Sequence, residues 1–316
     1  MFRILNNFRK FSTNPIDEIL ILNERKAIMR SKLRNIAVAE QFNRKSIDFV
    51  INESNDIKRN LKDYNNKLKG KYLANIYYEP STRIASNFEN AMLRLGGEVL
   101  NFTIPPPSLI KNELLIDTLK VLEQYTDISV LRHPKLEVYK NILPHLKNPL
   151  INAGDRIDKY PTQSLIDIMT IKNELNLNII EKINITLVGN LKYERNIHSL
   201  VQMLSNYNRI TFNFVSPVEL QMPKEIKKLV NYKEYTSYKN VINETDVLYM
   251  TRLQNNEYTL TLKDLDNVQD NLIIMHPLPR VNEIDISVDD HKSAKYFNQV
   301  KNGLYIQMTL LLNSLS

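Results

Sequence analysis

The stretch YEPSTRIASNF, from Tyr78 to Phe88, joins a predicted strand directly to a predicted helix. The mostly apolar run Tyr72–Tyr78 is typical of a short buried strand, and Pro80 ends it. Apolar side chains then recur at helical spacing from Phe88 to Leu95, so we expect a helix there. A strand that turns directly into a helix leaves backbone N–H groups unpaired at the turn, with the positive end of the helix dipole behind them.

The side chains at this turn favour an anion. Ser81 and Thr82 supply hydroxyl donors, and Arg83 supplies a planar guanidinium suited to a bidentate contact with an oxyanion. Together with the helix N-terminus they predict a phosphate site. The alternative is an ordinary capped helix with a surface arginine, because Ser and Thr are common N-caps. The stretch alone does not choose between the two.

Strands and helices alternate along the rest of the chain, which favours parallel, doubly wound sheets. The further strands that we predict are Glu98–Thr103, Ile128–Leu131, Pro149–Ala153, Ile183–Val188, Ile210–Val215, Asp246–Met250 and Leu272–Met275. The further helices are Ser46–Leu61, Leu114–Tyr125, Pro161–Leu175, Asn196–Tyr207 and Leu304–Asn313. We therefore expect an α/β protein with two doubly wound parallel-sheet domains and the active site in the cleft between them.

The pattern restarts after the helix at Pro161, and this divides the chain. We predict a first domain over residues 35–165, a second over 166–300, and a C-terminal helix over 301–316 that packs back on the first. Residues 1–34 form an N-terminal extension. Its first 16 residues contain Arg3, Arg9 and Lys10 and no acid, a composition similar to an organelle transit peptide. We expect a cytoplasmic protein, with an organelle as the alternative if this segment is a transit peptide.

Composition limits the function classes. The 316 residues include 43% hydrophobic and 24% charged side chains, as in globular proteins, and no apolar run approaches the ~18 residues of a membrane span. The absence of cysteine excludes disulfides, thiolate metal sites and cysteine nucleophiles. No His/Asp/Glu spacing suggests a metal site. The net charge of +7 is scattered, without the basic block and interleaved aromatics of a nucleic-acid-binding protein, so it favours small anionic substrates.

Polar residues gather where the predicted strands end, and ligands of such sheets bind beyond the carboxyl ends of strands. These residues are Ser81–Arg83, Arg132–His133, Asn152–Gln163, Arg195, Arg252 and His276–Arg280. A single arginine at a strand end can be a salt-bridged surface residue. Five arginines that flank one expected cleft, namely Arg83, Arg132, Arg195, Arg252 and Arg280, favour an anion site instead.

Six short motifs follow one another along the chain. They are EPSTR at 79–83, NAGD at Asn152–Asp155, YPTQ at Tyr160–Gln163, LKYERNIHS at Leu191–Ser199, YMTRLQ at Tyr249–Gln254 and MHPLPR at Met275–Arg280. In order and spacing they resemble the aspartate carbamoyltransferases over nearly all of residues 35–316. MHPLPR is the most discriminating motif, because the ornithine-using relatives have a cysteine-containing motif there and this chain has no cysteine.

The resemblance implies acyl transfer in pyrimidine biosynthesis. The amine of L-aspartate attacks the carbonyl carbon of carbamoyl phosphate, a tetrahedral oxyanion forms, and phosphate leaves to give N-carbamoyl-L-aspartate. No metal or organic cofactor is expected, because this catalysis consists of positioning and charge stabilisation. Residues 35–165 would bind carbamoyl phosphate and residues 166–300 would bind aspartate.

The resemblance also assigns residues. Those implied for carbamoyl phosphate are Ser81, Thr82, Arg83, Arg132, Gln163 and Lys111. Those implied for aspartate are Arg195, Arg252, Gln254, Pro277 and Leu278. The residues implied to be catalytic are Arg83, Arg132, Tyr160 and Lys111. Arg132 would join the phosphate and the carbonyl oxygen, and Gln163 would contact the carbamoyl amine.

The family borrows one loop from a neighbouring subunit. The matching segment here is Pro107–Glu113, where the family has Ser-Ser-Val-x-Lys-Gly-Glu and this chain keeps Lys111. Lys111 would reach the phosphate bound by the adjacent chain. The resemblance therefore implies a homotrimer with shared active sites. From the composition we expect no nucleic-acid or membrane partner.

Two departures concern the donors to the carbamoyl carbonyl oxygen. The family's Thr is here Ile84 and its His before Pro-Thr-Gln is here Tyr160, while Arg132 is kept. A missing oxyanion donor costs about 100–1000-fold in rate, although the phenol of Tyr160 can donate. Pro107 and Asn112 also differ from the shared loop of the family. The expected function is a working aspartate carbamoyltransferase, with a degenerate, anion-binding member of little or no turnover as the alternative.

Overall fold

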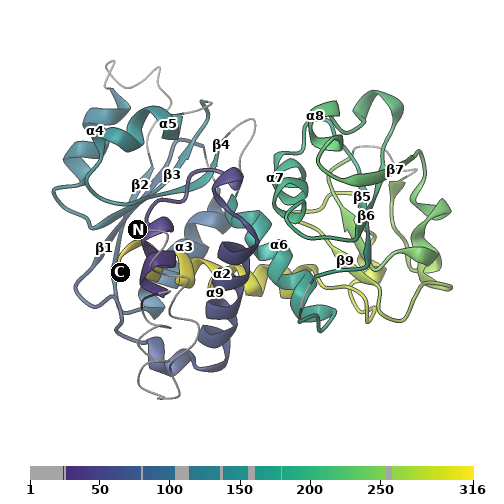
Figure 1. The fold of residues 1–316 in the computed structure, drawn as a ribbon, viewed down its shortest axis with the longest axis horizontal. Coiled ribbons are helices and arrows are strands. Elements are labelled where there is room, and N and C mark those ends of the chain that lie inside the picture. Colours follow the sequence, from purple (N-terminus) through teal and green to yellow (C-terminus); the bar gives the residue numbers. More distant parts are fainter. Residues whose placement is uncertain are drawn as a thin grey trace, which may run out of the picture.

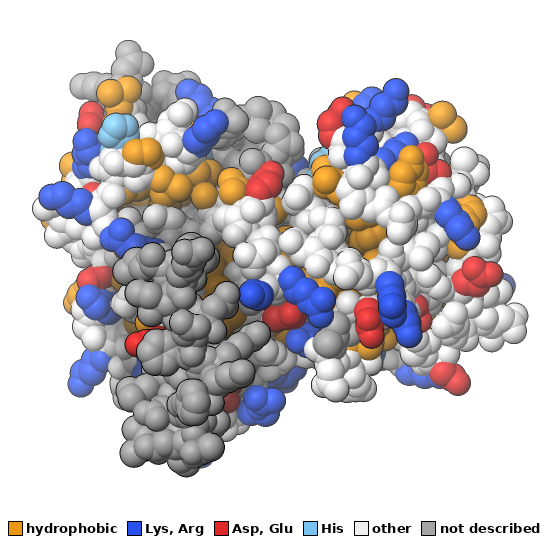
Figure 2. All heavy atoms as spheres, in the orientation of Figure 1, with side chains coloured by type: hydrophobic (Ala, Val, Ile, Leu, Met, Phe, Trp, Pro, Cys, Tyr) orange, Lys and Arg blue, Asp and Glu red, His pale blue; other side chains and the backbone are white. Residues whose placement is uncertain are grey.

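A computed structural model describes residues 24, 26–79, 81–103, 114–135, 138–155, 161–178, 180–253 and 258–316. Two parallel sheets lie in separate lobes, each with helices packed against it (Figure 1). None of the helices within the described ranges combines the length and apolar character that a membrane span needs. Lys and Arg side chains are distributed over both lobes among Asp and Glu on the face shown in Figure 2.

The first sheet has the strand order β2-β1-β3-β4 and is parallel throughout. Its strands are β1 Tyr72–Tyr77, β2 Glu98–Thr103, β3 Ile128–His133 and β4 Leu150–Asp155. The helices of this lobe are α2 Arg44–Arg59, α3 Thr82–Arg94, α4 Leu115–Leu122, α5 Val138–Ile142 and α6 Pro161–Glu174. Side chains of β1 point alternately to the two faces: Leu73 and Tyr77 join the core beneath α2 and α3, and Ala74 and Ile76 join the core beneath α4 and α5.

The second sheet has the order β7-β6-β5-β8-β9 and is also parallel. Its strands are β5 Ile183–Val188, β6 Ile210–Val215, β7 Asn231–Tyr235, β8 Val247–Met250 and β9 Ile273–Met275. The helices of this lobe are α7 Arg195–Leu204 and the short α8 Lys224–Lys227. The apolar side of α7 covers one face of β5 and β6, and a separate cluster around Tyr238 and Leu248 covers the other.

The C-terminal helix α9, Tyr296–Ser314, starts beside β9 and runs back across the first lobe, where it packs against α2, α3 and α6 (Figure 1). A close approach requires Gly303: a Cβ atom there would lie 2.8 Å from Asn87 Nδ2 and 3.2 Å from Ile166 Cδ1. Because α9 is one continuous helix that contacts β9 in the second lobe and three helices in the first, it holds the two lobes together.

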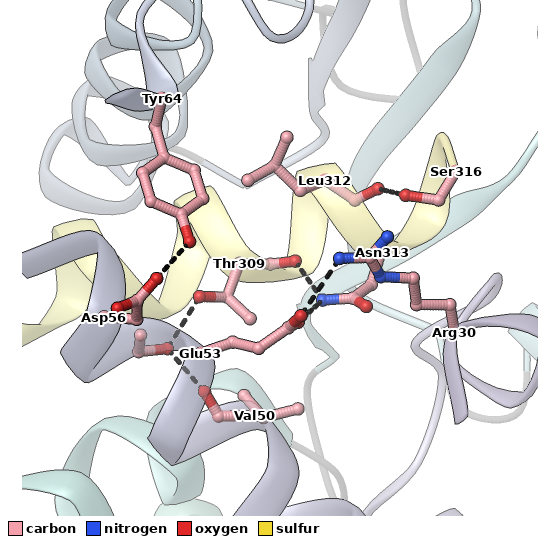
Figure 3. A network of polar contacts seen from close by, with 10 residues as sticks. Arg30, Val50, Glu53, Asp56, Tyr64, Thr309, Leu312, Asn313 and Ser316 are labelled. Carbon is pink, nitrogen blue, oxygen red and sulfur yellow. Dashed lines mark hydrogen bonds and ion pairs between the residues drawn. The ribbon is translucent and has the colours of Figure 1, made fainter. Parts of the chain in front are cut away.

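Polar contacts fix the far end of α9 to α2 (Figure 3). The hydroxyls of Ser54 and Thr309 lie 2.8 Å apart, and Asn313 Nδ2 donates to Glu53 Oε2 at 2.8 Å. Glu53 also pairs with Arg30 at 3.0 Å. Ser54 and Thr309 are fully buried, so their mutual hydrogen bond satisfies groups that would otherwise be costly to bury.

The predicted fold class is confirmed, and the differences are the ends of some elements and one strand that was not predicted. β3 continues through His133, so Arg132 lies within the strand and not after it. α9 begins at Tyr296, before the expected residue 301. The expected boundary at 165/166 lies within α6, the helix that was predicted over Pro161–Leu175. The strand β7 was not predicted, because its sequence NYKEY is mostly exposed at the sheet edge and has no apolar pattern.

Candidate active site

Each sheet has one point where the strand order reverses. In the first sheet β1 has β2 on one side and β3 on the other, and in the second sheet β5 has β6 and β8 on its two sides. Crevices at such points are where open parallel sheets bind ligands. Arg83 follows β1 and Arg132 lies near the end of β3, while Arg195 follows β5 and Arg252 follows β8. The topology therefore places one pair of arginines at each reversal.

These two pairs line one cavity of about 770 Å³ between the lobes. The lining residues with predicted roles are Ser81, Thr82, Arg83, Arg132, Gln163, Arg195, Arg252, Pro277 and Leu278. Guanidiniums from both sheets thus face one hollow, as the cleft hypothesis requires. The described residues contain no group of three or more His, Asp or Glu side chains able to hold a metal ion.

The N-terminus of α3 opens into this cavity. Ser81 is its N-cap residue and makes no side-chain capping bond, and the first turn contains no acidic residue. The helix dipole and the first-turn N–H groups there favour an anion. The guanidinium of Arg83 donates from Nη1 to the carbonyl oxygen of Pro277 at 3.0 Å and from Nη2 to that of Leu278. The predicted phosphate turn therefore contacts the other lobe directly.

Two contacts fix the guanidinium of Arg132, and one of its N–H donors is left without a partner among the described residues. Its Nη1 donates to the carbonyl oxygen of Ala153 at 3.3 Å, and Nη2 pairs with Glu79 Oε2 at 3.4 Å. Its side chain is only 17% exposed. Nε is buried without a hydrogen-bond partner among the described residues. A buried, unpaired donor on a cation is costly unless a ligand satisfies it.

The second lobe presents its cations at the start of α7 and after β8. Arg195 is the first residue of α7, and Arg252 is exposed at the cavity wall. An acid that sequence analysis did not single out lines the same cavity: Glu194, the N-cap residue of α7. Burial raises the pKa of its carboxyl above the ordinary value, while Arg252 and Arg195 oppose that rise.

The loop after β9 turns its backbone toward the first lobe. His276 is fully buried, and its Nδ1 accepts a hydrogen bond from the backbone N–H of Leu278 at 2.8 Å. Burial lowers the pKa of His276 to about 4, so the ring is neutral and Nε2 carries its proton. This histidine therefore shapes the loop and has no lone pair left to act as a base.

Gln163 reaches the cavity from the first turn of α6. Its Nε2 donates to Oδ1 of Asp167 at 2.8 Å, one helical turn further on. Asp167 is fully buried beneath the cavity.

Three predicted site residues, Lys111, Tyr160 and Gln254, lie outside the described residues. Arg280, the last of the strand-end arginines, is not part of the cavity wall. Its Nη2 donates to Asp289 Oδ2 at 2.7 Å and its Nη1 to the hydroxyl of Tyr296 at 3.1 Å. Its role is to fix the loop after β9.

Other cavity residues were missed by the sequence analysis. They are Ile166, Glu194, Asn196, Gln299, Val300 and Gln307, together with Ser86, Asn87 and Asn90 on α3. Gln299 and Gln307 could have been found from the sequence, because two polar residues eight positions apart on one side of a mostly apolar helix suggest a polar surface there. Glu194 stands inside a quoted motif, and only the fold shows that it faces the two arginines.

The fold and the cavity together define an α/β protein of two lobes with a cleft between them that is lined by cations from both sheets. Residues 34–173 match the carbamoyl-phosphate-binding domain of aspartate/ornithine carbamoyltransferases, and residues 181–313 match the Asp/Orn-binding domain. The chain belongs to the aspartate/ornithine carbamoyltransferase family.

Several relatives bear this out. The aspartate carbamoyltransferase catalytic subunit of Clostridium acetobutylicum is 40% identical over 84% of this chain and 94% of its own length. A stretch of the multifunctional protein pyr1-3 of Dictyostelium discoideum is 40% identical over 88% of this chain, which spans only 13% of that larger protein.

Solved structures show the same fold. The catalytic subunit of M. jannaschii aspartate transcarbamoylase superposes with a TM-score of 0.83 at 37% identity, over 89% of this chain and 97% of that one. Trypanosoma cruzi aspartate transcarbamoylase in complex with carbamoyl phosphate and aspartate gives 0.83 at 34% identity, over 89% and 96%. Nothing among these relatives favours the degenerate alternative.

Proposed function

We propose that this protein is an aspartate carbamoyltransferase, which transfers the carbamoyl group of carbamoyl phosphate to L-aspartate in pyrimidine biosynthesis. The observation that carries the proposal is the single cavity lined by Arg83, Arg132, Arg195 and Arg252 from two sheets. A dianionic phosphate and a dicarboxylate must touch during this reaction, and cations on both sides offset their mutual repulsion. Residues 35–165 supply the carbamoyl phosphate half and residues 166–300 the aspartate half.

The phosphate binds at the N-terminus of α3. Ser81, Thr82 and the first-turn N–H groups donate to its oxygens, and Arg83 turns from the carbonyls of Pro277 and Leu278 to grip it. Lys111 of an adjacent chain adds a further cation.

The carbonyl of carbamoyl phosphate lies toward Arg132, whose free Nε stabilises the oxyanion as it forms. Gln163 contacts the carbamoyl amine and Tyr160 supplies a phenolic donor. Arg195, Arg252 and Gln254 hold the carboxylates of aspartate, and the carbonyl oxygens of Pro277 and Leu278 accept from its attacking amine. Because His276 is neutral with Nδ1 occupied, the departing phosphate takes the amine proton.

One assay tests this function. The purified full chain, given carbamoyl phosphate and L-aspartate, should release phosphate and form N-carbamoyl-L-aspartate in equal amounts, and Arg83→Ala should abolish both. Release of phosphate without carbamoyl-aspartate, or no turnover at all, would overturn the proposal.

Ile84 gives the first prediction. Its side chain lines the cavity and is packed against the core, where it offers no hydrogen bond. We expect Ile84→Thr to raise kcat by about tenfold or more, because it adds an oxyanion donor. Ile84→Val is the matched control, since Val has the shape of Thr without the hydroxyl, and both should lose about 1 kcal/mol of stability. Equal rates for the two variants would show that another group already donates to the oxyanion in place of the family's Thr.

Glu194 gives the second prediction. Its carboxylate partly neutralises the two arginines that receive aspartate, so Glu194→Gln should lower the KM for aspartate about fivefold, from about 1 kcal/mol of removed repulsion. The KM for carbamoyl phosphate should stay constant. Glu225→Gln, on the exposed helix α8, is the control. A raised KM in Glu194→Gln would instead mean that the acid orients the arginines.

We propose a homotrimer with shared sites. The described residues just after the 107–113 segment expose apolar side chains, namely Leu114 at 63%, Val121 at 52% and Tyr125 at 62%. Such a cluster next to a shared loop suits a subunit interface. Light scattering should give three times the chain mass of 37.0 kDa, and a fully active monomer would contradict the proposal.

We also propose a cytoplasmic location, with an organelle as the alternative if residues 1–16 are a transit peptide. Fractionation of cells that express the chain with and without these residues distinguishes the two.

A further inference from the structure

A single carboxylate, Asp167, lies under the floor of the cavity with no solvent exposure. It accepts hydrogen bonds from side chains on three elements. Gln163 on α6 donates to Oδ1 at 2.8 Å, Gln299 on α9 donates to the same oxygen at 2.7 Å, and Tyr249 on β8 donates to Oδ2 at 3.0 Å. All three partners are donors, which matches the acceptor-only character of an ionised carboxylate.

Each of these hydrogen-bond donors is also connected, by a further hydrogen bond or along the chain, to a different part of the site. Gln299 accepts, through Oε1, the backbone N–H of His276 at 3.0 Å, and His276 begins the loop that carries Pro277 and Leu278. The hydroxyl of Tyr249 receives Asn196 Nδ2 at 3.4 Å, and Asn196 follows Arg195 on α7. The strand of Tyr249 ends just before Arg252.

The same carboxylate is therefore connected to segments of both lobes. Its neighbours are the carbamoyl contact Gln163, the junction loop after β9, and the two segments that carry the arginines for aspartate. α6 and α9 are also the helices that join the lobes (Figure 1). A group at this place sets the position of one half-site relative to the other.

We propose that Asp167 is a positioning residue for the reaction: through Gln163, Gln299 and Tyr249 it aligns the carbamoyl phosphate half of the cavity with the aspartate half. This inference rests on the proposed function. Misplacement of reacting groups by about 1 Å can cost about 100-fold in rate, so a shared anchor beneath both half-sites has a direct effect on turnover.

The two oxygens of Asp167 divide the network. Oδ1 serves Gln163 and Gln299, and Oδ2 serves Tyr249 alone. In Asp167→Asn the amide oxygen keeps its place opposite the two glutamine donors, and the NH₂ group faces Tyr249, whose O–H then loses its acceptor. Asp167→Asn therefore disturbs the contact to Tyr249 on the aspartate side of the cavity and keeps the contacts to Gln163 and Gln299. Tyr249→Phe removes the same contact from the other side.

The test compares kinetics in the full chain. We expect Asp167→Asn and Tyr249→Phe each to raise the KM for aspartate about tenfold with the KM for carbamoyl phosphate unchanged, and Asp167→Ala to lower kcat/KM for both substrates about 100-fold. Thr170→Val is the control, because Thr170 is equally buried on α6 and its hydroxyl, among the described residues, bonds to Ile166 and Asn302 and to no group of the Asp167 network. It should keep wild-type kinetics, and thermal melts show that each variant is folded at the assay temperature.

A pH profile gives a second readout. Burial raises the pKa of Asp167 to about 7, and it raises the pKa of Tyr249 so far that the phenol stays protonated. His276, joined through Gln299, stays neutral because burial lowers its pKa to about 4. The other charged groups on nearby elements are Arg195, Arg252 and Glu194, and burial raises the pKa of the Glu194 carboxyl. The kcat/KM of wild type for aspartate should therefore fall below about pH 7 as Asp167 gains a proton, and Asp167→Asn should lose this dependence while Glu194→Gln keeps it.

The two hypotheses fail differently. If wild type does not form carbamoyl-aspartate, the proposed function falls. If wild type is active but Asp167→Asn and Tyr249→Phe match Thr170→Val in both KM values, or Asp167→Asn keeps the acid limb, Asp167 has only a structural role and the inference is wrong.

Discussion

Arg132→Ala should lower the kcat of carbamoyl transfer by about 1000-fold, because it removes a buried cation whose unpaired Nε, in the mechanism that we propose, stabilises the forming oxyanion. The family's Thr donor is already replaced by Ile84 here, so the site depends more heavily on this arginine. Steady-state rates of carbamoyl-aspartate formation at saturating substrates provide the measurement.

Two variants make the result specific. Arg132→Lys keeps the charge and loses the planar fork, so it should recover only a small part of the rate. Arg59→Ala, at the exposed end of α2 with a side chain 71% exposed, should leave kcat unchanged. A loss of less than about tenfold in Arg132→Ala would place the oxyanion elsewhere.

Arg252→Ala should raise the KM for aspartate by about 100-fold and leave the KM for carbamoyl phosphate nearly unchanged. Arg252 is exposed at the cavity wall on the aspartate side, and charge-assisted hydrogen bonds of this kind contribute about 1.5–3 kcal/mol each. Initial rates at varied concentrations of each substrate measure the two constants separately.

A comparison of L-aspartate with L-asparagine as substrates identifies the arginine that holds the side-chain carboxylate, because L-asparagine has an amide in place of that carboxylate. Of Arg195→Ala and Arg252→Ala, one should lose the preference for aspartate over L-asparagine and the other should keep it. If neither variant affects the KM for aspartate, the dicarboxylate does not bind between these two residues.

The sequence predicted the parallel sheets well because both faces of most strands are buried. Strands such as Ile183–Val188, with the sequence INITLV, are short segments rich in apolar and β-branched residues and bounded by turns, and this composition can be recognised without knowledge of the packing. β7 was missed because an exposed edge strand has no such pattern. The true start of α9 was missed because its first turns pack through polar side chains such as Gln299.

The location of the site was predicted from the polar residues at the carboxyl ends of the predicted strands. Arg83, Arg132, Arg195 and Arg252 were all placed in the cleft from sequence, since the carboxyl ends of parallel strands meet at one edge. What could not be predicted depends on contacts between distant residues. Nothing near Asp167 in the sequence shows that Tyr249 and Gln299 donate to it, and nothing near Arg83 shows its contact with Pro277.

The central claim is that one cavity holds a dianion and a diacid side by side on guanidiniums from two sheets. A crystal structure of this chain with N-(phosphonacetyl)-L-aspartate, a ligand with which the T. cruzi relative has been solved, tests it most directly. We predict the phosphonate at the N-terminus of α3 between Arg83 and Arg132, and the two carboxylates on Arg195 and Arg252. A phosphonate bound away from α3, or carboxylates that contact neither arginine of the second lobe, would contradict the account.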